Sequence, residues 1–298
     1  MAERTQTVPG IIGIGKAVGG RVVPNAEIFG DMDFSAWLAK RGRTNETPER
    51  IERLKSVVLE THKQTGIESR NWAVEGEATS DLAASAIRQA CEMAGISPSE
   101  LSGVTIGTMS QDYGGTPVGS MLQEKLQIGK NDWDSMDVGS ACVGFLHSLK
   151  SIYNSLDSSF GEDGPYVAGG AEVLSRMSNR KDPQTYPLFG DAAGAVVVAN
   201  VPDPNNLRSH IAFKFGANGS LAKELGVRVG GSLIPATAQL IEEGGNLIHM
   251  NGPVVAEEAV KRMTEFTELA LEKAGVKAGD LLLMVPHQAN LALIQGVA

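Results

Sequence analysis

The sequence is poor in the features that mark secreted, membrane-spanning or nucleic-acid-binding proteins. Two cysteines in 298 residues exclude a disulfide framework. No run of 18 uncharged apolar residues occurs, so no membrane-spanning helix is expected. The opening residues, MAERTQTVPG, lack the basic and apolar regions of a secretory signal. Lys and Arg number 26 against 35 Asp and Glu, and the net charge of −9 disfavours a general nucleic-acid surface. We therefore expect a cytoplasmic protein.

What the chain does contain is enough apolar sequence for a large core. Hydrophobic residues make up 42% of it and charged residues 20%. A length of 298 residues exceeds the usual size of one domain, which predicts two domains or two closely joined halves. The 35 glycines indicate many tight turns or close backbone approaches.

Two segments far apart in the chain follow the same pattern. Residues 80–94 and 254–274 each carry an apolar stripe at helical spacing, and Gly95 and Gly275 follow them where a left-handed residue closes a helix. The string Ala-Gly-Ile/Val recurs at an offset of 180 residues, and the next acidic residue and leucine keep that offset. The stripe of the first segment comprises Ala83, Ala86, Ile87, Ala90, Cys91 and Ala94. The pattern favours a duplicated chain.

A duplicated α/β chain predicts a particular fold class. Helices that alternate with buried apolar strands, including residues 104–108 and the run LLLMV at 281–285, predict a largely parallel sheet covered on both faces. Two such halves, residues 1–200 and 201–298, would stack into an α/β/α/β/α body. Only 23 residues follow Gly275, so we expect the second half to be incomplete.

One cysteine lies where sulfur chemistry is favoured. Cys142 joins the expected strand at Asp137 to an amphipathic helix, and a helix N-terminus stabilises a thiolate. The alternative is a buried structural cysteine, because Cys142 also begins the apolar stripe of that helix. Cys91, in the middle of a helix, fits only the structural role.

A nucleophilic cysteine needs a base or an oxyanion partner. His287 is the best placed of the five histidines, because it follows the expected strand 281–285 at its C-terminal end, where sites of α/β sheets gather. His249 lies in a plausible strand, NLIHM, as a supporting partner. The remaining histidines have no expected chemical role: His62, His147 and His210.

Several motifs, in order along the chain, resemble the β-ketoacyl-acyl carrier protein synthase III family of thiolase-like condensing enzymes. They are GIESR at 66–70, SACVGF around Cys142, GAEVLSR at 170–176, FGDAAGA from Phe189 and VPHQAN around His287. The resemblance implies a duplicated α/β fold and a decarboxylative Claisen condensation in fatty-acid or specialised lipid biosynthesis. Cys142 would take an acyl group from acyl-CoA. His287 would stabilise the enolate formed from malonyl-acyl carrier protein.

The resemblance also implies substrate contacts. Trp37 is a candidate for stacking on the CoA adenine, and Arg176 matches an arginine at the nucleotide site. Thr116 matches a position that reaches the partner's acyl pocket in a homodimer, where it would leave room for a longer chain. Phe189 and Asn290 complete the expected substrate-binding set. No metal or separate cofactor is implied.

The chain also departs from the family pattern. The family's catalytic Asn lies beyond the last residue, so we expect this exact chain to be nearly inactive. Ala292 replaces an arginine where the carrier protein docks, and Pro253 is unusual for a pocket-lining helix. The charged segment 41–64 is either a helix over the CoA entrance or, as we favour, a solvated helix.

Three alternative functions remain open. A relative of specialised metabolism fits the departures at Ala292 and Pro253. A cysteine hydrolase fits the separation of 145 residues between Cys142 and His287, although the Cys-Gly-x-Cys-Trp context of papain-like enzymes is missing. A non-catalytic pairing subunit or degenerate fragment is the third.

Overall fold

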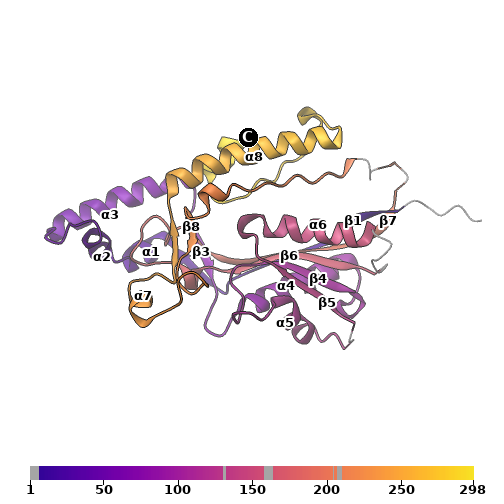
Figure 1. The fold of residues 1–298 in the computed structure, drawn as a ribbon, viewed down its shortest axis with the longest axis horizontal. Coiled ribbons are helices and arrows are strands. Elements are labelled where there is room, and N and C mark those ends of the chain that lie inside the picture. The colour runs from indigo at the N-terminus through magenta and orange to yellow at the C-terminus, as the bar shows by residue number, and fades with distance from the viewer. Residues whose placement is uncertain (1–6, 130–131, 158–163, 204, 207–209) are drawn as a thin grey trace, which may run out of the picture. The chain divides into compact units, whose positions relative to one another are not determined.

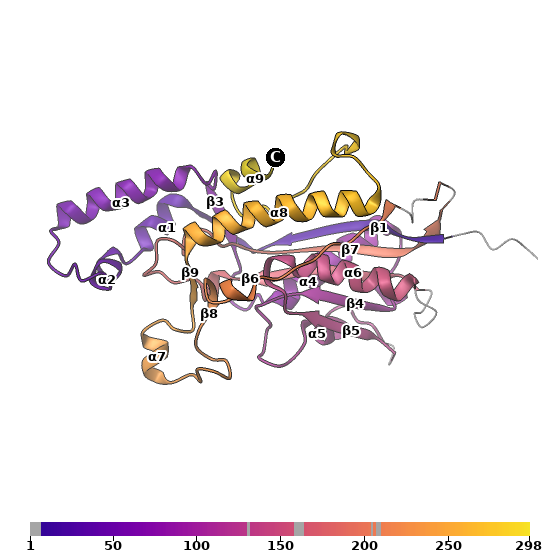
Figure 2. The same ribbon diagram turned by 45° about the horizontal axis from the view of Figure 1, so that its top comes forward.

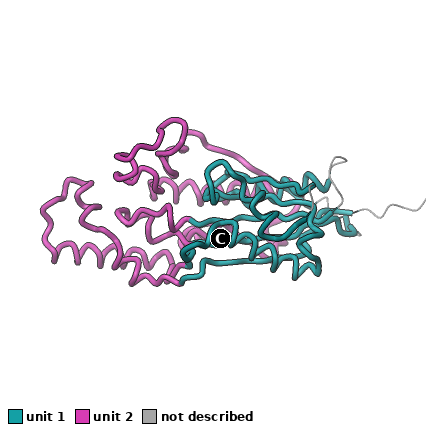
Figure 3. Tube along the Cα trace, turned by 90° about the horizontal axis from the view of Figure 1, so that it is seen from below, with its two compact units in different colours: residues 1–21, 71–173, 191–213 teal, residues 22–70, 174–190, 214–298 magenta. Residues whose placement is uncertain are grey.

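The computed structural model describes residues 7–129, 132–157, 164–203, 205–206 and 210–298. Its chain forms two compact units (Figure 3). The first unit comprises residues 1–21, 71–173 and 191–213, and the second comprises 22–70, 174–190 and 214–298. These interleaved units differ from the expected division at residue 200, which falls inside a strand, β7 (Asp191–Pro202).

The first unit is built on a five-stranded sheet in the order β1-β7-β6-β4-β5. β6 and β5 both run parallel to β4, whereas β7 is antiparallel to β6 and β1. Figure 2 shows β1 and β7 side by side as long strands. The expectation of a largely parallel sheet therefore holds for β4, β5 and β6 and is wrong for β1 and β7. The other strands of the sheet are β1 (Thr7–Val18), β4 (Gly103–Gly107), β5 (Asp134–Val138) and β6 (Tyr166–Val173).

Helices cover both faces of this sheet, as expected for an α/β fold. α4 (Thr79–Ala94) and α5 (Val118–Lys125) lie on one face and α6 (Gly144–Asp157) on the other (Figure 1). Residues alternate between the two cores along each strand, so Val167 of β6 packs with α4 while Ala168 packs with α6. The apolar stripe expected on α4 is confirmed, with Ala94 at its edge.

Glycines of β1 let α4 approach the sheet closely. A Cβ atom at Gly13 would lie 2.1 Å from the Ala90 carbonyl oxygen, and one at Gly15 would lie 2.0 Å from that of Ala86. Larger residues at either position would therefore push the helix off the strand. This contact explains why glycine stands at positions 13 and 15 of the strand.

The second unit consists mainly of helices with two small strand pairs, β2–β3 and β8–β9. No described helix, in either unit, is long and apolar enough to cross a membrane. The strands of these pairs are β2 (Arg21–Pro24), β3 (Ser69–Trp72), β8 (Leu225–Val227) and β9 (Ile248–Met250), and the division between the units falls within β2 and within β3. The α-helices of the second unit are α1 (Asn25–Asp31), α2 (Phe34–Ala39), α3 (Pro48–Lys63), α7 (Ala238–Glu242), α8 (Gly252–Ala274) and α9 (Leu291–Val297).

The internal repeat is confirmed in the backbone. α4 and α8 both end at a glycine in the left-handed region, Gly95 with φ 70° and Gly275 with φ 66°. The N–H of Ile96 donates to the Cys91 carbonyl at 3.0 Å, and at the same offset Val276 donates to Leu271 at 3.0 Å. A 3-10 turn follows in each case, η1 (Pro98–Glu100) and η6 (Ala278–Asp280). Both helix ends are Schellman-type caps.

Beyond these turns the two copies differ. The first copy continues into the buried strand β4, but residues 281–285 form no strand, and Leu282 and Leu283 are 103% and 77% exposed. α8 likewise has no buried residue. The expectation of a second buried strand at 281–285 is wrong for the described chain, because a strand needs a hydrogen-bonded neighbour and none of the described strands pairs with this run.

Candidate active site

Cys142 lies in the first unit, at the junction between a sheet strand and a helix. β5 ends at Val138, a 3-10 turn, η2 (Ala141–Val143), follows, and α6 begins at Gly144. Cys142 is exposed, unlike the buried cysteine of the structural alternative, and Cys91 is buried, as a structural role requires. The strand end and the helix start therefore present the sulfur of Cys142 to solvent.

The backbone just before Cys142 is strained. Ala141 has a φ of 45°, in the left-handed region that residues with a Cβ atom rarely occupy. Such a conformation costs on the order of 1–2 kcal/mol, and strained residues cluster at functional sites because the surrounding structure holds them. Ala141 therefore makes a sharp turn between the end of β5 and Cys142.

Two glycines hold this turn against the sheet. A Cβ atom at Gly107, the last residue of β4, would lie 2.4 Å from the carbonyl carbon of Gly144. The first residue of α6 therefore rests on the C-terminal end of β4. This contact fixes the position of the Cys142 turn at the edge where the parallel strands end.

The electrostatics of the thiol differ from the expectation. Burial by surrounding protein raises the pKa of Cys142, and the carboxyl group of Glu172 raises that pKa further, whereas the Cys142 backbone N–H lowers it. The prediction that the helix end leaves a net stabilised thiolate is therefore wrong. At neutral pH the resting group is the thiol, and a nucleophilic role needs a proton acceptor.

Glu172 is a residue near this site that the sequence reasoning missed. It lies near the C-terminal end of β6 and accepts hydrogen bonds from the Met109 N–H at 2.8 Å and from the Ser110 hydroxyl. Burial raises the pKa of its carboxyl group. An acidic side chain within GAEVLSR at a strand end was the available signal.

Thr116 lies on an exposed loop of the first unit. The loop 108–117 leads from β4 to α5, and the Thr116 N–H donates to the Tyr113 carbonyl at 3.2 Å. Within the loop, the carboxylate of Asp112 accepts a hydrogen bond from the Ser80 N–H at 3.0 Å. After the loop, the carboxylate of Asp137 in β5 accepts a hydrogen bond from the Val118 N–H at 2.7 Å.

His287 and Asn290 lie in the second unit, on the loop before α9. His287 keeps exposed surface, although desolvation by nearby protein lowers the pKa of its imidazole and so favours the neutral ring. The side-chain oxygen of Asn290 accepts from the Leu293 N–H at 3.0 Å and caps α9. Asn290 therefore shapes the loop that carries His287, and its expected contact with substrate stays a prediction.

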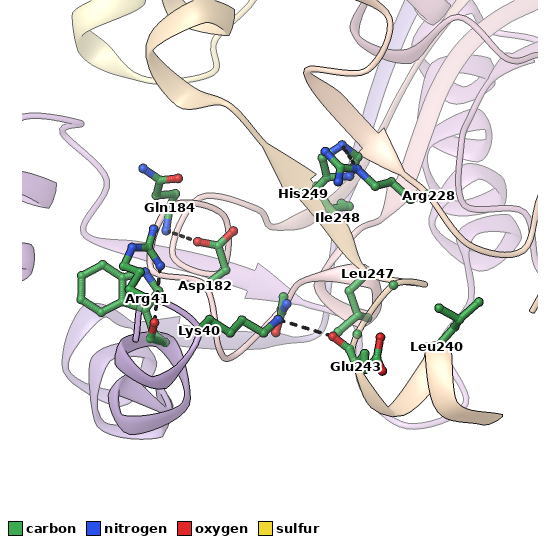
Figure 4. A pocket seen from close by; sticks show the side chains of 14 residues that line it. Lys40, Arg41, Asp182, Gln184, Arg228, Leu240, Glu243, Leu247, Ile248 and His249 are labelled. Atoms are coloured by element: carbon green, nitrogen blue, oxygen red, sulfur yellow. Dashed lines mark hydrogen bonds between the residues drawn. The ribbon is translucent and has the colours of Figure 1, made fainter. Parts of the chain in front are cut away.

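Trp37 lines a pocket of about 340 Å³ in the second unit (Figure 4). The guanidinium carbon of Arg41 lies 4.4 Å from the centre of the Trp37 ring. Lys40 donates to the Glu243 carbonyl at 3.4 Å, and Arg228 donates to Nε2 of His249 at 3.0 Å. The pocket is thus lined by one aromatic ring and three cationic side chains, of which Arg41 lies over the ring, a combination that suits an anionic aromatic ligand.

Two predicted contact residues lie in the second unit outside the lining of this pocket. Arg176 is exposed in the 3-10 turn η3 (Ser175–Met177), and Phe189 is half-buried just before β7. His249 lies in β9 and accepts a hydrogen bond from Arg228, and its expected role as a supporting partner in the site stays a prediction. His62, which the sequence reasoning set aside, is instead buried, with 6% of its surface exposed.

The charged segment 41–64 folds largely as α3. Its single buried residue is His62, and its charges pair along the helix, as in Lys55–Glu52 and Lys63–Glu60, both at 2.7 Å. These contacts agree with a solvated charged helix.

Comparisons with known proteins agree with the motifs. The family model of 3-oxoacyl-[acyl-carrier-protein (ACP)] synthase III matches residues 136–219, which include Cys142. A β-ketoacyl-[acyl-carrier-protein] synthase III of Symbiobacterium thermophilum is 32% identical over 286 residues, which cover 96% of this chain and 78% of the relative. One from Staphylococcus saprophyticus is 36% identical over 233 residues, covering 78% and 68%. The crystal structure of the Aquifex aeolicus synthase III is 28% identical with a TM-score of 0.74, covering 98% and 80%.

Proposed function

Because the chain belongs to the β-ketoacyl-[acyl-carrier-protein] synthase III family of acyltransferases, we propose that Cys142 is the residue that carries the acyl group during its decarboxylative condensation. The observation that supports this role most directly is an exposed cysteine after a strained residue, at the junction of β5 and α6. The family's thiolase-like α/β fold is the scaffold for this chemistry.

In the first half-reaction, the sulfur of Cys142 attacks the thioester carbonyl of an acyl-CoA. A new carbon–sulfur bond forms to Cys142, the bond to the CoA sulfur breaks, and the proton lost by Cys142 ends on the released CoA thiol. Since burial raises the pKa of Cys142, its thiol must lose its proton in the step in which the sulfur attacks.

In the second half-reaction, malonyl-acyl carrier protein loses CO₂ and the bonding electrons form an enolate. The enolate carbon attacks the acyl carbonyl, and the sulfur of Cys142 leaves. His287 donates a hydrogen bond to the thioester oxygen as negative charge develops there, which lowers the barrier. The lowered pKa of His287 favours the neutral ring, whose single N–H is the donor in this hydrogen bond.

The pocket at Trp37 is the proposed binding place for the nucleotide of acyl-CoA. The adenine would stack on the indole, where it shares the ring with Arg41. Phosphate groups would contact Lys40 and Arg228. With Arg41, the pocket lining has three cationic side chains against the two carboxylates of Asp182 and Glu243, so its net charge is positive. Arg176, Phe189 and Asn290 belong to the same proposal as further contacts of the substrate.

The remaining features of the proposal concern the acyl chain, the assembly and the compartment. Thr116, on its exposed loop, would leave space for a longer acyl chain in a homodimer. A cytoplasmic location fits the net charge of −9 and the metabolic substrates. Ala292 is exposed on α9 and lacks the positive charge expected where a carrier protein docks, which favours a condensing enzyme of specialised metabolism as the second candidate.

Intact-protein mass spectrometry after incubation with an acyl-CoA tests the role of Cys142. We expect one acyl adduct on the natural chain, none on Cys142→Ser, and an unchanged adduct on Cys91→Ser. His287→Ala should be acylated but should form the β-ketoacyl product from malonyl-acyl carrier protein about 100-fold more slowly. An adduct that survives in Cys142→Ser, or release of free acid without any need for malonyl groups, contradicts the proposal.

A further inference from the structure

The second unit contains a buried arginine that pairs with no carboxylate among the described residues. Arg70 of β3 is 4% exposed. Its guanidinium donates to three neutral acceptors, the side-chain oxygen of Asn25, the carbonyl of Pro187 and, at 2.6 Å, Nε2 of His62. Burying a charge without an opposite charge is costly, and burial lowers the pKa of Arg70 to about 10. Such a costly group suggests a role beyond filling space.

His62 is matched to this arginine. It is 6% exposed at the end of α3, and the ring of Phe29 packs against it at 5.3 Å. Burial first, and the charge of Arg70 second, lower the pKa of His62 to about 4. The imidazole is therefore neutral at pH 7 and accepts the hydrogen bond from Arg70 with its unprotonated Nε2.

One branch of this network reaches the loop that carries Phe189. The Arg70 guanidinium donates to the carbonyl of Pro187, two residues before Phe189 in the chain. Tyr186, beside Pro187, is also buried and donates to the carboxylate of Asp31 at 2.6 Å. Two adjacent residues of the loop, Tyr186 and Pro187, are therefore held by polar contacts.

The other branch reaches the loop that carries His287. The hydroxyl of Thr65 donates to the His62 carbonyl at 2.7 Å, and the Thr65 carbonyl accepts from the Leu291 N–H at 2.8 Å. Gly66, with φ +69°, is so close to Leu291 that an added Cβ atom would lie 2.9 Å from the Leu291 Cβ. The turn after α3 therefore contacts Leu291, four residues beyond His287, through a hydrogen bond and close packing.

We propose that Arg70 and His62 are a positioning pair that holds the Phe189 loop and the His287 loop in one fixed arrangement within the second unit. The positional effect on the reaction rests on the proposed function, in which His287 acts in condensation. The mechanical part of the proposal, that the pair keeps the two loops ordered, does not rest on the proposed function. A pair that fixes both loops would affect the condensation step and leave acyl transfer to Cys142 nearly unchanged.

Hydrogen–deuterium exchange of the full chain tests the mechanical part. In Arg70→Lys, which keeps the charge but cannot reach three acceptors at once, we expect exchange about tenfold faster or more in peptides covering 185–190 and 288–298. The α4 peptide 79–94 should be unchanged. Arg53→Lys, the same substitution at an exposed α3 position, is the matched control and should alter none of these peptides. Unchanged exchange in either loop, or an equal rise in α4, overturns the proposal.

The histidine provides a conservative rescue. His62→Gln retains a neutral acceptor for Arg70 and should keep most of the protection of both loops, whereas His62→Leu should lose it. Equal exchange in these two variants overturns the role of the Nε2 acceptor.

A double-mutant comparison tests the effect on the reaction. Arg70→Lys alone should lower kcat of condensation about tenfold or more with little change in acylation. In the His287→Ala background it should cause no further loss, because the two residues act through one group. Additive losses would show that Arg70 acts only on general stability and would overturn the positioning role. If His287→Ala itself condenses normally, the proposed function fails instead, and the exchange result still decides the mechanical part.

Discussion

Lowering the pH should weaken the protein through His62. The pKa of this imidazole is 6.5 when unfolded and about 4 in the folded protein, because it is buried beside Arg70. Between these two values the unfolded chain binds more protons, so folding stability is complete above pH 6.5 and is lost as the pH falls towards 4. From pH 7 to pH 5 the loss from His62 alone is about 2 kcal/mol.

The assay is urea unfolding, followed by tryptophan fluorescence, at pH 7 and pH 5. Since carboxyl groups and other histidines also titrate, the decisive quantity is the difference between the natural chain and His62→Gln. The natural chain should lose about 2 kcal/mol more than His62→Gln over this interval. His210→Gln, which replaces an exposed histidine, should lose as much as the natural chain. Equal losses in the natural chain and His62→Gln would refute the buried, neutral imidazole.

Three further predictions concern the sites and the turns. Gly76→Ala, at φ +80° with nothing near its Cβ position, should cost about 1 kcal/mol from backbone strain, and Gly66→Ala, which adds a clash with α9, about 2–4 kcal/mol in urea unfolding. Iodoacetamide should label exposed Cys142 about 100-fold faster than Cys91, because burial raises the pKa of Cys91 to about 11. The labelling rate at Cys142 should keep rising above pH 9, because the pKa of Cys142 is also raised. Equal labelling rates at the two cysteines would contradict the assignment. Trp37→Ala should raise KM for acyl-CoA about tenfold through lost stacking, but not KM for an acyl-pantetheine thioester without the nucleotide, and a similar rise for both would exclude adenine at Trp37.

Local features were the most predictable part of the fold. The stripe of α4 and the caps at Gly95 and Gly275 were visible because they depend on residues at most five positions apart. The junction at Cys142 was visible for the same reason, since a strand followed by small residues and an apolar helical stripe defines it. The resemblance to the family rested on short motifs of this kind, and the comparisons confirmed it.

Features that depend on distant partners were predicted poorly. The run 281–285 has the composition of a buried strand, but composition cannot provide the neighbouring strand, and the run is exposed. The antiparallel pairing of β1 with β7 joins residues nearly 190 positions apart, which periodicity does not report. The role of Glu172 beside Cys142 was missed because it requires the order of the strands in the sheet.

The amino-acid sequence by itself determined the helical repeat, the family and the chemical identity of the candidate nucleophile, because each is carried by neighbouring residues. Only the tertiary structure decided that the Cys142 thiol has a raised pKa, that Ala141 is strained and that His62 is buried against Arg70. Desolvation and hydrogen bonding are set by whichever atoms surround a group in space. Those atoms come from segments that the chain brings together only on folding.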